Sequence, residues 1–401
     1  MEHTIIAFIN IRSGSTAVSE SVYRKLLRLL PKGHCYELVG TNVEEILLKF
    51  SHFHGLRLIV GGGDGSNSSF LREMSKVKFD HGPVGVALLP LGTGNELARV
   101  YGWGKSYGGG DLSEYVKCVN LAEPSPLDLW KIMISPASPA VDESNSLESA
   151  VCATPAKGTS CSSTSADVNE DQSRTSPVNA IVMSCFFSIG LDAYVSKQFH
   201  KFRENRPGVC NTRSMNKVVY TAFGIQSFFA CRSLQDSANI CLDGNDVNLA
   251  KGVEGVTFLN IPSTADGTNP WKQRRKLGGK KESPKIAKTN DHIHADERIS
   301  GDKTSMDGWT LQSPADGRLE IVSYQGAVHL GGIQAGVVGG GRLGQASTAE
   351  LKILKRDVPA QVDGEPVVLH AGDTIRIEQV GQAWILRAPS FYNSSYINGG
   401  K

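Results

Sequence analysis

A short apolar run that ends in four glycines around one acid constrains this chain most. Leu58–Val60 has the composition of a buried strand, and it runs directly into the loop Gly61, Gly62, Gly63, Asp64, Gly65 and Ser66. Glycines remove the Cβ atoms that keep a bulky anion away from the backbone, so successive N–H groups can turn toward phosphate oxygens. Asp64 would repel a bare phosphate but suits one that arrives with a divalent cation. A tight surface turn is the alternative that this loop alone leaves open.

Two further loops have the same design. Pro83–Pro90 is an apolar strand, and it is followed by Gly92, Thr93, Gly94, Asn95 and Glu96 at the start of a helix. Near the amino terminus, Ile5–Ile9 ends in a small polar loop that contains Asn10, Ser13 and Gly14. Loops at the carboxyl ends of parallel strands face the same side of a sheet, so all three can line one crevice. The pattern predicts a Rossmann-like α/β domain at the amino terminus.

Whole-chain properties exclude several classes of protein. The 401 residues allow two or three domains, and a net charge of +2 gives no global field of the kind that marks a nucleic-acid binder. The eight cysteines contain no CxxC pair, and without a secretory-type leader they predict reduced thiols in the cytoplasm. No apolar stretch approaches the ~18–20 residues that span a bilayer, so we expect any membrane contact to be peripheral.

Two stretches interrupt the globular pattern. Residues 135–177 are dominated by Ser, Thr, Ala, Asp, Glu and Pro, and this composition predicts a disordered insertion. Residues 272–303 are rich in Lys and Arg. The preferred interpretation of the second stretch is a solvated, mobile insertion, and a loop that rests on an anionic membrane is the alternative.

The second half of the chain has a different pattern of apolar and polar residues. Short segments alternate apolar and polar residues between Gly, Asp and Asn turns, which predicts strands over Asn179–Gly190, Gly255–Ile261, Arg318–Ser323, Thr348–Leu354, Pro366–Leu369, Thr374–Gln379 and Ala383–Arg387. Helices are predicted over Tyr194–Glu204 and Asn216–Ala230. We therefore expect a mostly antiparallel β-sandwich domain behind the α/β domain, with the boundary near Leu127–Trp130.

The order of these motifs resembles that of eukaryotic diacylglycerol kinases. The similar segments are Gly61–Ser66, Pro90–Asn95, Phe187–Ala193, Phe199–Glu204, Asn260–Ser263, Gly267–Trp271, Asp316–Glu320, Arg342–Ala346 and Val362–Pro366. The first loops are shared with sphingosine, ceramide and NAD kinases, whereas the later segments are similar to the diacylglycerol kinase accessory domain. The resemblance implies an NAD kinase/diacylglycerol kinase type of fold, with a catalytic domain over 1–130, the disordered insertion 135–177 and an accessory domain over 178–390 that holds the basic insertion 272–303. No zinc-finger spacing is present, so the layout is similar to that of plant-type enzymes without C1 domains.

The resemblance also implies an activity and its cofactors. It implies transfer of the γ-phosphoryl group of ATP to the free hydroxyl of diacylglycerol, which gives phosphatidate. The implied ATP-binding residues are Asn10, Ser13, Gly14, Thr41, Gly61, Gly62, Gly63, Asp64, Gly65, Ser66, Gly92, Thr93, Gly94 and Asn95. Mg²⁺ is assigned to Asp64, Asp128 and Glu96, the last of which stands where the family commonly carries Asp or Asn.

The acceptor alcohol needs a group that takes its proton, and a carboxylate within hydrogen-bond reach can do so. Asp363 matches the base of the family, and Glu365 lies two residues on, where it can orient that carboxylate. Asp-Gly is also a common hairpin turn, which is the alternative interpretation of Asp363. We expect a cytoplasmic, peripheral-membrane enzyme that uses ATP and Mg²⁺ and takes diacylglycerol between its domains. A kinase for ceramide or sphingosine, and a degenerate kinase fold that acts as a regulatory module, stay open.

Overall fold

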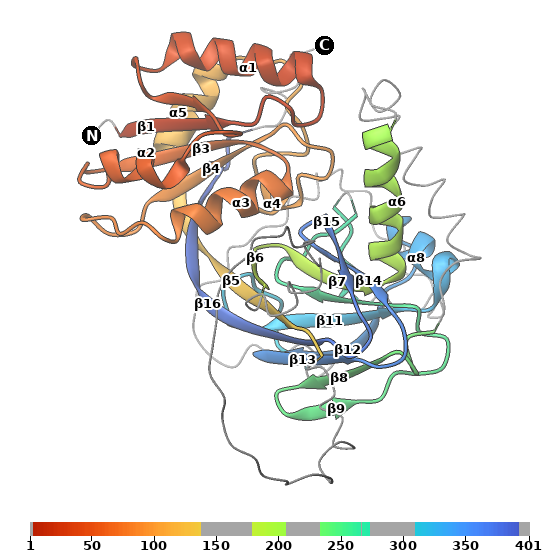
Figure 1. Cartoon of the computed structure of the whole chain (residues 1–401). Coiled ribbons are helices and arrows are strands. Elements are labelled where there is room, and N and C mark those ends of the chain that lie inside the picture. Colours follow the sequence, from red (N-terminus) through yellow and green to blue (C-terminus); the bar gives the residue numbers. More distant parts are fainter. Residues whose placement is uncertain (1–2, 138–178, 206–232, 266, 273–308, 393–401) are drawn as a thin grey trace, which may run out of the picture.

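A computed structural model describes residues 3–137, 179–205, 233–265, 267–272 and 309–392, which form two stacked parts (Figure 1). The predicted insertions 135–177 and 272–303 fall almost entirely outside the described residues, and the helix predicted over 216–230 falls wholly outside them.

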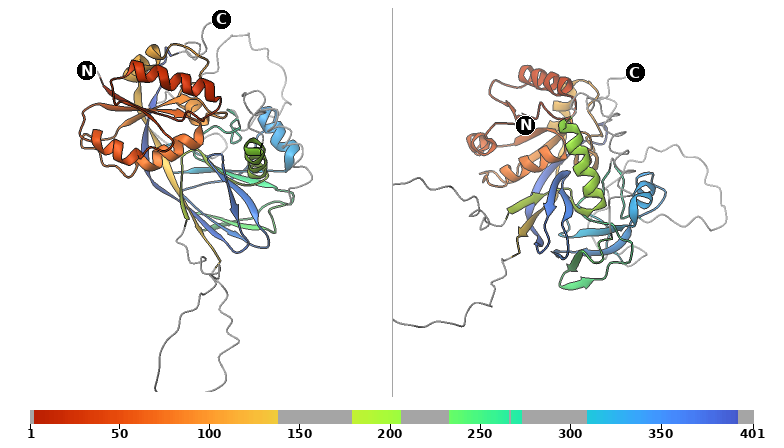
Figure 2. Two further views of the ribbon diagram at one scale, coloured as in Figure 1. Left: turned by 45° about the horizontal axis from the view of Figure 1, so that its top comes forward. Right: turned by 45° about the vertical axis from the view of Figure 1, so that its right-hand side comes forward.

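The amino-terminal part is the predicted α/β layer. Its parallel strands lie in the order β2 (Cys35–Glu37), β1 (Thr4–Ile9), β3 (Leu56–Gly62) and β4 (Gly85–Pro90). Five helices accompany them: α1 (Thr16–Leu29), α2 (Val43–Phe50), α3 (Asp64–Met74), α4 (Glu96–Val100) and α5 (Leu112–Leu121). Figure 2 shows α1 over one face of the sheet and α2 and α3 over the other. Both faces are therefore covered, which explains why the strands are continuous apolar runs rather than alternating ones.

Two long strands join the amino-terminal part to the rest of the chain. β5 (Glu123–Ser135) and β16 (Thr374–Arg387) pair with each other along their whole length in an antiparallel ribbon. Residues Trp384 and Ile385 of β16 also pair in parallel with β4, whereas the first half of β16 pairs with β13 (Thr348–Ile353). One sheet thus runs through both parts, and the expected boundary near residue 130 falls inside β5.

The second part is the predicted antiparallel sandwich. One layer continues the first sheet through β16, β13, β8 (Ala238–Leu242) and β9 (Asn245–Val247), while β6 (Asn179–Met183) pairs with β5. The other layer is a six-stranded antiparallel sheet in the order β12 (Gly341–Ala346), β11 (Leu319–Tyr324), β10 (Gly255–Leu259), β7 (Phe186–Gly190), β14 (Val358–Val362) and β15 (Glu365–Leu369). Apolar side chains of both layers, such as Trp130, Phe187, Phe258 and Ile377, form one buried cluster between them.

Two helices lie on the outer face of the six-stranded sheet. α6 (Leu191–Asn205) packs on β7, β14 and β15, and α8 (Gly326–Gln334) contacts β11 (Figure 1). α6 confirms the helix predicted over Tyr194–Glu204, with one additional turn at its start.

Candidate functional site

Three glycine-containing loops meet at the carboxyl edge of the parallel sheet. Gly14 has a φ of +61°, and a Cβ there would lie 2.0 Å from the Leu91 carbonyl oxygen. A Cβ on Gly92 would lie 2.4 Å from the Cα of Gly63. The backbones of the loops touch, so residues with side chains do not fit at these points. The structure brings together the loops after β1, β3 and β4, as the strand-end pattern predicts.

Side-chain amides fix the shape of these loops. Asn10 Nδ2 donates to Ser66 Oγ at 2.9 Å and so ties the first loop to the second. Asn95 is buried in the left-handed region at φ +55°, and its Nδ2 donates to the carbonyls of Gly92 and Lys105. Its Oδ1 accepts from the Gly92 amide at 3.0 Å. Asn95 therefore supports the backbone of the loop with both polar atoms of its side chain.

The other expected nucleotide-binding residues lie at the same edge. Thr41 follows β2, whose carboxyl end is next to that of β1, and it immediately precedes the cap residue of α2. Ser13 Oγ lies 3.7 Å from where a Gly63 Cβ would stand. Thr93 and Gly94 are half-buried and precede α4. The edge thus presents backbone amides and small hydroxyl side chains from four successive strands.

Two acids of this edge flank Gly94. A Cβ on Gly94 would lie 2.9 Å from Asp64 Oδ2 and 3.6 Å from Glu96 Oε1. Asp64 accepts hydrogen bonds of 3.1 Å from the amides of both Glu96 and Leu97, so it caps the first turn of α4. Burial raises the pKa of the Asp64 carboxyl above its usual value, although these two amide bonds act in the opposite direction.

Glu96 also contacts the second part of the chain. Its Oε2 accepts from Ser263 Oγ at 2.5 Å and from the Gly267 amide at 3.0 Å. These donors belong to the segment that follows β10. The side chain of Glu96 is long enough to reach them, which gives a structural reason for Glu where the family commonly carries a shorter side chain.

Asp128 lies in a different environment from Asp64 and Glu96. It is fully buried in β5, where its Oδ2 accepts from the Gly317 amide and its Oδ1 accepts from the side-chain amides of Gln379 and Gln382. Within the described residues, no three His, Cys, Asp or Glu side chains form a group that could hold a metal ion. The structure therefore brings two of the three expected metal acids together and places Asp128 against β16.

Asp363 occupies a hairpin turn and a polar interface at once. It connects β14 to β15 with φ +49°, and Gly364 follows with φ +88°, which is the conformation of a type I′ turn. Its buried carboxylate faces inward, toward α3 and β7. The turn and the site are thus not alternatives, because the backbone makes the hairpin while the side chain enters the junction between the two parts.

Hydrogen-bond donors surround the Asp363 carboxylate. Oδ1 accepts from the amides of Cys185 and Phe186, both at 2.8 Å. Oδ2 accepts from the Ser184 amide at 2.7 Å and from Ser68 Oγ at 2.5 Å. Ser184 Oγ lies 2.7 Å from Ser68 Oγ and 3.1 Å from Asp363 Oδ2. Burial raises the pKa of the Asp363 carboxyl, and the hydrogen bonds from Ser68 and the three amides offset part of this rise.

Glu365 lies against the second glycine loop. A Cβ on Gly65 would lie 2.6 Å from Glu365 Oε1, so this exposed side chain covers the first turn of α3. Ser68, Ser184 and Ser263 were not among the expected site residues, although each contacts a carboxylate that was. Only Ser263 had a sequence signal, because it belongs to the Asn260–Ser263 segment that resembles the family.

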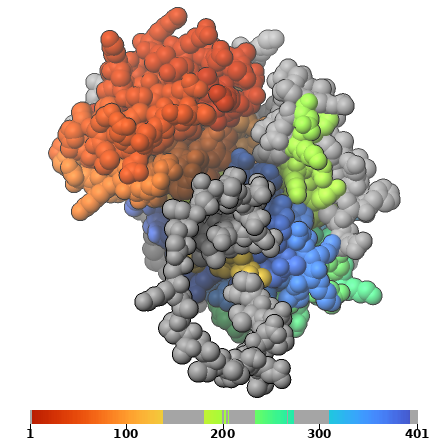
Figure 3. Space-filling view, in the orientation of Figure 1, coloured from red at the N-terminus to blue at the C-terminus, as the bar shows by residue number. Residues whose placement is uncertain are grey.

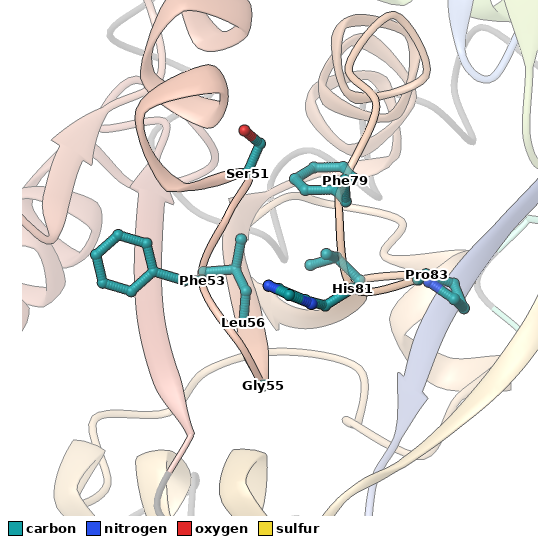
Figure 4. A pocket seen from close by; sticks show the side chains of 9 residues that line it. Ser51, Phe53, Gly55, Leu56, Phe79, His81 and Pro83 are labelled. Carbon is teal, nitrogen blue, oxygen red and sulfur yellow. The ribbon is translucent and has the colours of Figure 1, made fainter.

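A surface pocket of the α/β part lies at the opposite edge of its sheet (Figure 4). It is lined by Ser51, Phe53, Gly55, Leu56, Phe79, His81, Gly82, Pro83 and Val84. These residues precede or begin β3 and β4, whereas the glycine loops follow the same strands. The pocket is therefore separate from the site built by the loops.

Comparisons with known proteins agree with this arrangement. The model of the diacylglycerol kinase catalytic domain matches residues 4–132, and the model of the diacylglycerol kinase accessory domain matches residues 182–366. The chain belongs to the diacylglycerol kinase family. The two matched ranges follow one another as the α/β part and the sandwich do.

Relatives in the family come from animals and plants. Probable diacylglycerol kinase 3 of Caenorhabditis elegans is 30% identical over 366 residues, which are 90% of this chain and 41% of that protein. Diacylglycerol kinase theta of Homo sapiens is 30% identical over 375 residues, 92% of this chain and 33% of that protein. Diacylglycerol kinase 2 of Arabidopsis thaliana is 28% identical over 393 residues, 96% of this chain and 46% of that protein. The chain thus spans less than half the length of these curated relatives.

A solved structure shows the same fold. The crystal structure of a candidate diacylglycerol kinase from Bacillus anthracis superposes with a TM-score of 0.50 at 13% identity, covering 97% of this chain and 98% of the other. The expected α/β domain followed by an antiparallel sandwich is confirmed. In the described part of the chain, no helix has the length and apolar character needed to cross a bilayer.

Proposed function

We propose that this member of the diacylglycerol kinase family transfers the γ-phosphoryl group of ATP to the free hydroxyl of diacylglycerol. The observation that carries the proposal is the placement of Asp363. Its buried carboxylate lies under the first turns of α3, whose amino terminus is the glycine loop, and Ser68 of that helix contacts it at 2.5 Å. The proposed proton acceptor of one part of the chain therefore lies next to the proposed nucleotide loop of the other.

The three loops would bind the phosphates of ATP through backbone amides. Phosphoryl transfer asks a protein mainly for positioning and for neutralisation of charge, and a set of preorganised amides supplies both. The contacts between Gly14 and Leu91 and between Gly63 and Gly92 hold the loops in register. Ser13, Thr41, Ser66 and Thr93 would add hydroxyl contacts at the same edge.

Asp64 and Glu96 fit a divalent cation that accompanies ATP, because their carboxylates flank Gly94 and oxygen ligands suit Mg²⁺. When bound, the cation would neutralise charge on the phosphate oxygens. Asp128 does not form a group with these two acids and accepts from the Gly317 amide and from Gln379 and Gln382 of β16, so we assign it to holding Gly317 and β16 in place rather than to the cation.

Asp363 would accept the proton of the acceptor hydroxyl as the new bond to phosphorus forms. Burial raises the pKa of this carboxylate and makes it a stronger base, and the hydrogen bonds from Ser68 and the three amides offset part of that rise. Glu365 lies over Gly65, where it would hold the glycine loop at the start of α3 in place above the proposed base.

A substrate comparison tests the proposal. The protein is incubated with labelled ATP, Mg²⁺ and mixed micelles that hold diacylglycerol, ceramide or sphingosine. We expect labelled phosphatidate, with ceramide and sphingosine phosphorylated far more slowly. Preferential labelling of ceramide or sphingosine would show that this lipid, and not diacylglycerol, is the substrate. Absence of any product while ATP still binds would overturn the enzymatic proposal in favour of a regulatory module.

A further inference from the structure

Hydrogen-bond donors fill the acceptor capacity of the proposed base. The amides of Ser184, Cys185 and Phe186 and the hydroxyl of Ser68 all donate to the two carboxylate oxygens of Asp363. To act as a base, the carboxylate must be ionised, and in this form it offers about four lone-pair sites. A lipid hydroxyl that approached the carboxylate directly would therefore have to displace one of these donors.

The three amide donors belong to a firmly held segment of backbone. Asn260 is fully buried, its Nδ2 donates to the Ser184 carbonyl at 2.6 Å, and its amide donates to the Cys185 carbonyl at 2.9 Å. The Asp363 amide donates to the Phe186 carbonyl at 2.9 Å. Displacement of an amide would thus require movement of the chain, whereas a hydroxyl donor can reorient by rotation about one side-chain bond.

The hydroxyl donor, Ser68, lies where the two parts of the chain meet. It is on α3, which packs against β6, and Figure 3 shows the α/β part lying directly against the second part. Ser68 Oγ lies 3.0 Å from the Asp64 carbonyl oxygen and 2.5 Å from Asp363 Oδ2. Its one proton goes to Asp363, because a charged acceptor forms the shorter and stronger bond. Ser68 is 7% exposed, compared with 3% for Asp363 and 0% for Ser184, so it is the most accessible of the three.

The Ser68 oxygen can also accept hydrogen bonds while it donates to Asp363. A hydroxyl carries one proton and two lone pairs. Ser184 Oγ lies 2.7 Å from Ser68 Oγ and can donate to one of these lone pairs, and a hydroxyl of the substrate can donate to the other. Ser68 can therefore take up one proton as it gives up another, which is the requirement for a proton relay.

Ser68 is also close to the proposed phosphate position. The glycine loop Gly61–Ser66 runs directly into α3, and the bond from Ser68 Oγ to the Asp64 carbonyl returns to this loop. A lipid hydroxyl that donates to Ser68 would thus lie beside the loop that we propose for the phosphates of ATP.

We propose that Ser68 relays the proton of the acceptor hydroxyl to Asp363. The inference rests on the proposed function and adds a second catalytic residue to it. As the acceptor oxygen bonds to the γ-phosphorus, its proton moves to Ser68 Oγ and the Ser68 proton moves to Asp363 Oδ2. The bond from the γ-phosphorus to the bridging oxygen breaks, and its electron pair stays on ADP. Asp363 ends the step protonated and gives the proton to water after the products leave.

Single-turnover rates of the full chain in mixtures of H₂O and D₂O test the relay, because they report the chemical step apart from binding and product release. Excess protein is mixed with labelled ATP, Mg²⁺ and diacylglycerol micelles. A relay moves two protons in one step, so the rate of the unchanged chain should fall along a downward-bowed curve as the D₂O fraction rises.

Ser68→Ala should slow this step by about 10²-fold, because the acceptor and the base would then be one hydroxyl apart. It also opens one lone pair of Asp363 to direct transfer of a single proton, so the dependence on D₂O should become a straight line. Ser69→Ala is the matched control, since Ser69 is exposed on the same helix, and it should keep the rate and the curve. Thermal midpoints and binding of a non-hydrolysable ATP analogue should be the same in both variants, which shows that any loss of rate is not unfolding.

Three results would overturn the relay. They are a straight line for the unchanged chain, a rate of Ser68→Ala within about tenfold of the unchanged chain, and a loss of curvature in Ser184→Ala but not in Ser68→Ala. Asp363→Asn separates this inference from the proposed function. Full turnover by Asp363→Asn would refute the proposed base itself, whereas an inactive Asp363→Asn beside an active Ser68→Ala would refute the relay alone.

Discussion

Ser68 and Asp363 are 295 residues apart in the chain, and their side chains meet at 2.5 Å. Ser68 is on the helix that starts with the glycine loop, and Asp363 is in the turn between β14 and β15. Ser68 Oγ donates its proton to Asp363 Oδ2, so the Ser184 hydroxyl is left to donate to either of them. The helix that starts with the glycine loop and the proposed base are thus connected by one hydrogen bond.

Ser68→Ala should raise the pKa of Asp363, because it removes a donor that stabilises the charged carboxylate. The acid limb of the pH profile of kcat/KM for diacylglycerol should move to higher pH by about one unit. Ser69→Ala is the control, since Ser69 is exposed on the same helix and should leave the profile unchanged. An unmoved limb, or a limb moved to lower pH, would show that Ser68 does not position the base.

Gly92→Ala should separate two of the nucleotide loops. The new Cβ would lie 2.4 Å from the Cα of Gly63, and neither backbone can rotate away as a side chain could. We expect binding of a non-hydrolysable ATP analogue, measured by calorimetry, to weaken at least about tenfold. Gly331→Ala in α8 meets no atom within 4 Å and should bind the analogue normally. Equal affinities for the two variants would contradict the proposed role of the loop contact.

Glu96→Asp should loosen the junction between the two parts. The carboxylate would retreat by about 1.5 Å and lose its hydrogen bonds to Ser263 and Gly267. The expected cost is about 1–2 kcal/mol in the free energy of unfolding, measured by chemical denaturation. Glu114→Asp on α5, where the half-buried Glu114 contacts only the exposed Lys117 among charged side chains, should cost less than about 0.5 kcal/mol. A loss of stability in Glu96→Asp as small as that in Glu114→Asp would contradict the role of Glu96 in joining the two parts.

Glu320→Gln should alter the pH dependence of stability. Glu320 is fully buried in β11, and burial raises its pKa from 4.5 to about 8, with the Gln345 hydrogen bond acting in the opposite direction. The folded state therefore holds this proton more tightly than the unfolded chain. Its contribution to stability is complete below about pH 4.5 and is lost as the pH rises through 8.

Unfolding free energies of the unchanged chain and of Glu320→Gln are therefore compared from pH 5 to pH 9. The stability of the unchanged chain should decline over this range, and that of Glu320→Gln should decline much less. At pH 9 the variant should be more stable than the unchanged chain by on the order of 3 kcal/mol. Glu350→Gln, at an exposed position of β13, should keep the decline in stability with rising pH. A parallel decline in Glu320→Gln would show that Glu320 is ionised in the folded protein at neutral pH.

The edge at which the three glycine-containing loops meet could be predicted from the sequence because its signals are local. Each loop follows directly on an apolar strand, and parallel strands place such loops at one edge whatever the rest of the chain does. The glycines were informative for the same reason. Gly63 and Gly92 mark a contact between backbones, although the sequence could not say that they contact each other.

Features that depend on distant pairing could not be predicted. Thr374–Gln379 and Ala383–Arg387 were expected as two strands, yet they form the single β16, because the irregularity between Gln379 and Gly381 is a bulge opposite β5 and not a turn. β14 was not expected, since Pro359 weakens the strand pattern. Pro359 pairs with Val368 of β15, whereas the pairing of β14 with β7 begins only at Ala360. The missing N–H of Pro359 therefore costs no hydrogen bond to β7.

Side-chain partners were the least predictable part of the site. Nothing near Asp363 in the sequence indicates Ser68 or Ser184, because the contacts arise from the packing of α3 against the second sheet. Asp128 is a similar case, because nothing near it in the sequence indicates the amide donors that the fold supplies from Gly317, Gln379 and Gln382. α8 was not expected either, because its glycines are typical of loops.

The most direct test of the central claim is the rate of phosphatidate formation by Asp363→Asn. Asn tolerates the positive φ of this turn, and retained nucleotide binding and thermal midpoint would show that the fold survives. Removal of the base should lower the turnover of diacylglycerol by about 10²–10⁴-fold while ATP binds as before. Turnover within about tenfold of the unchanged chain, in a variant that is folded and binds ATP, would contradict the assignment of Asp363 as the proton acceptor.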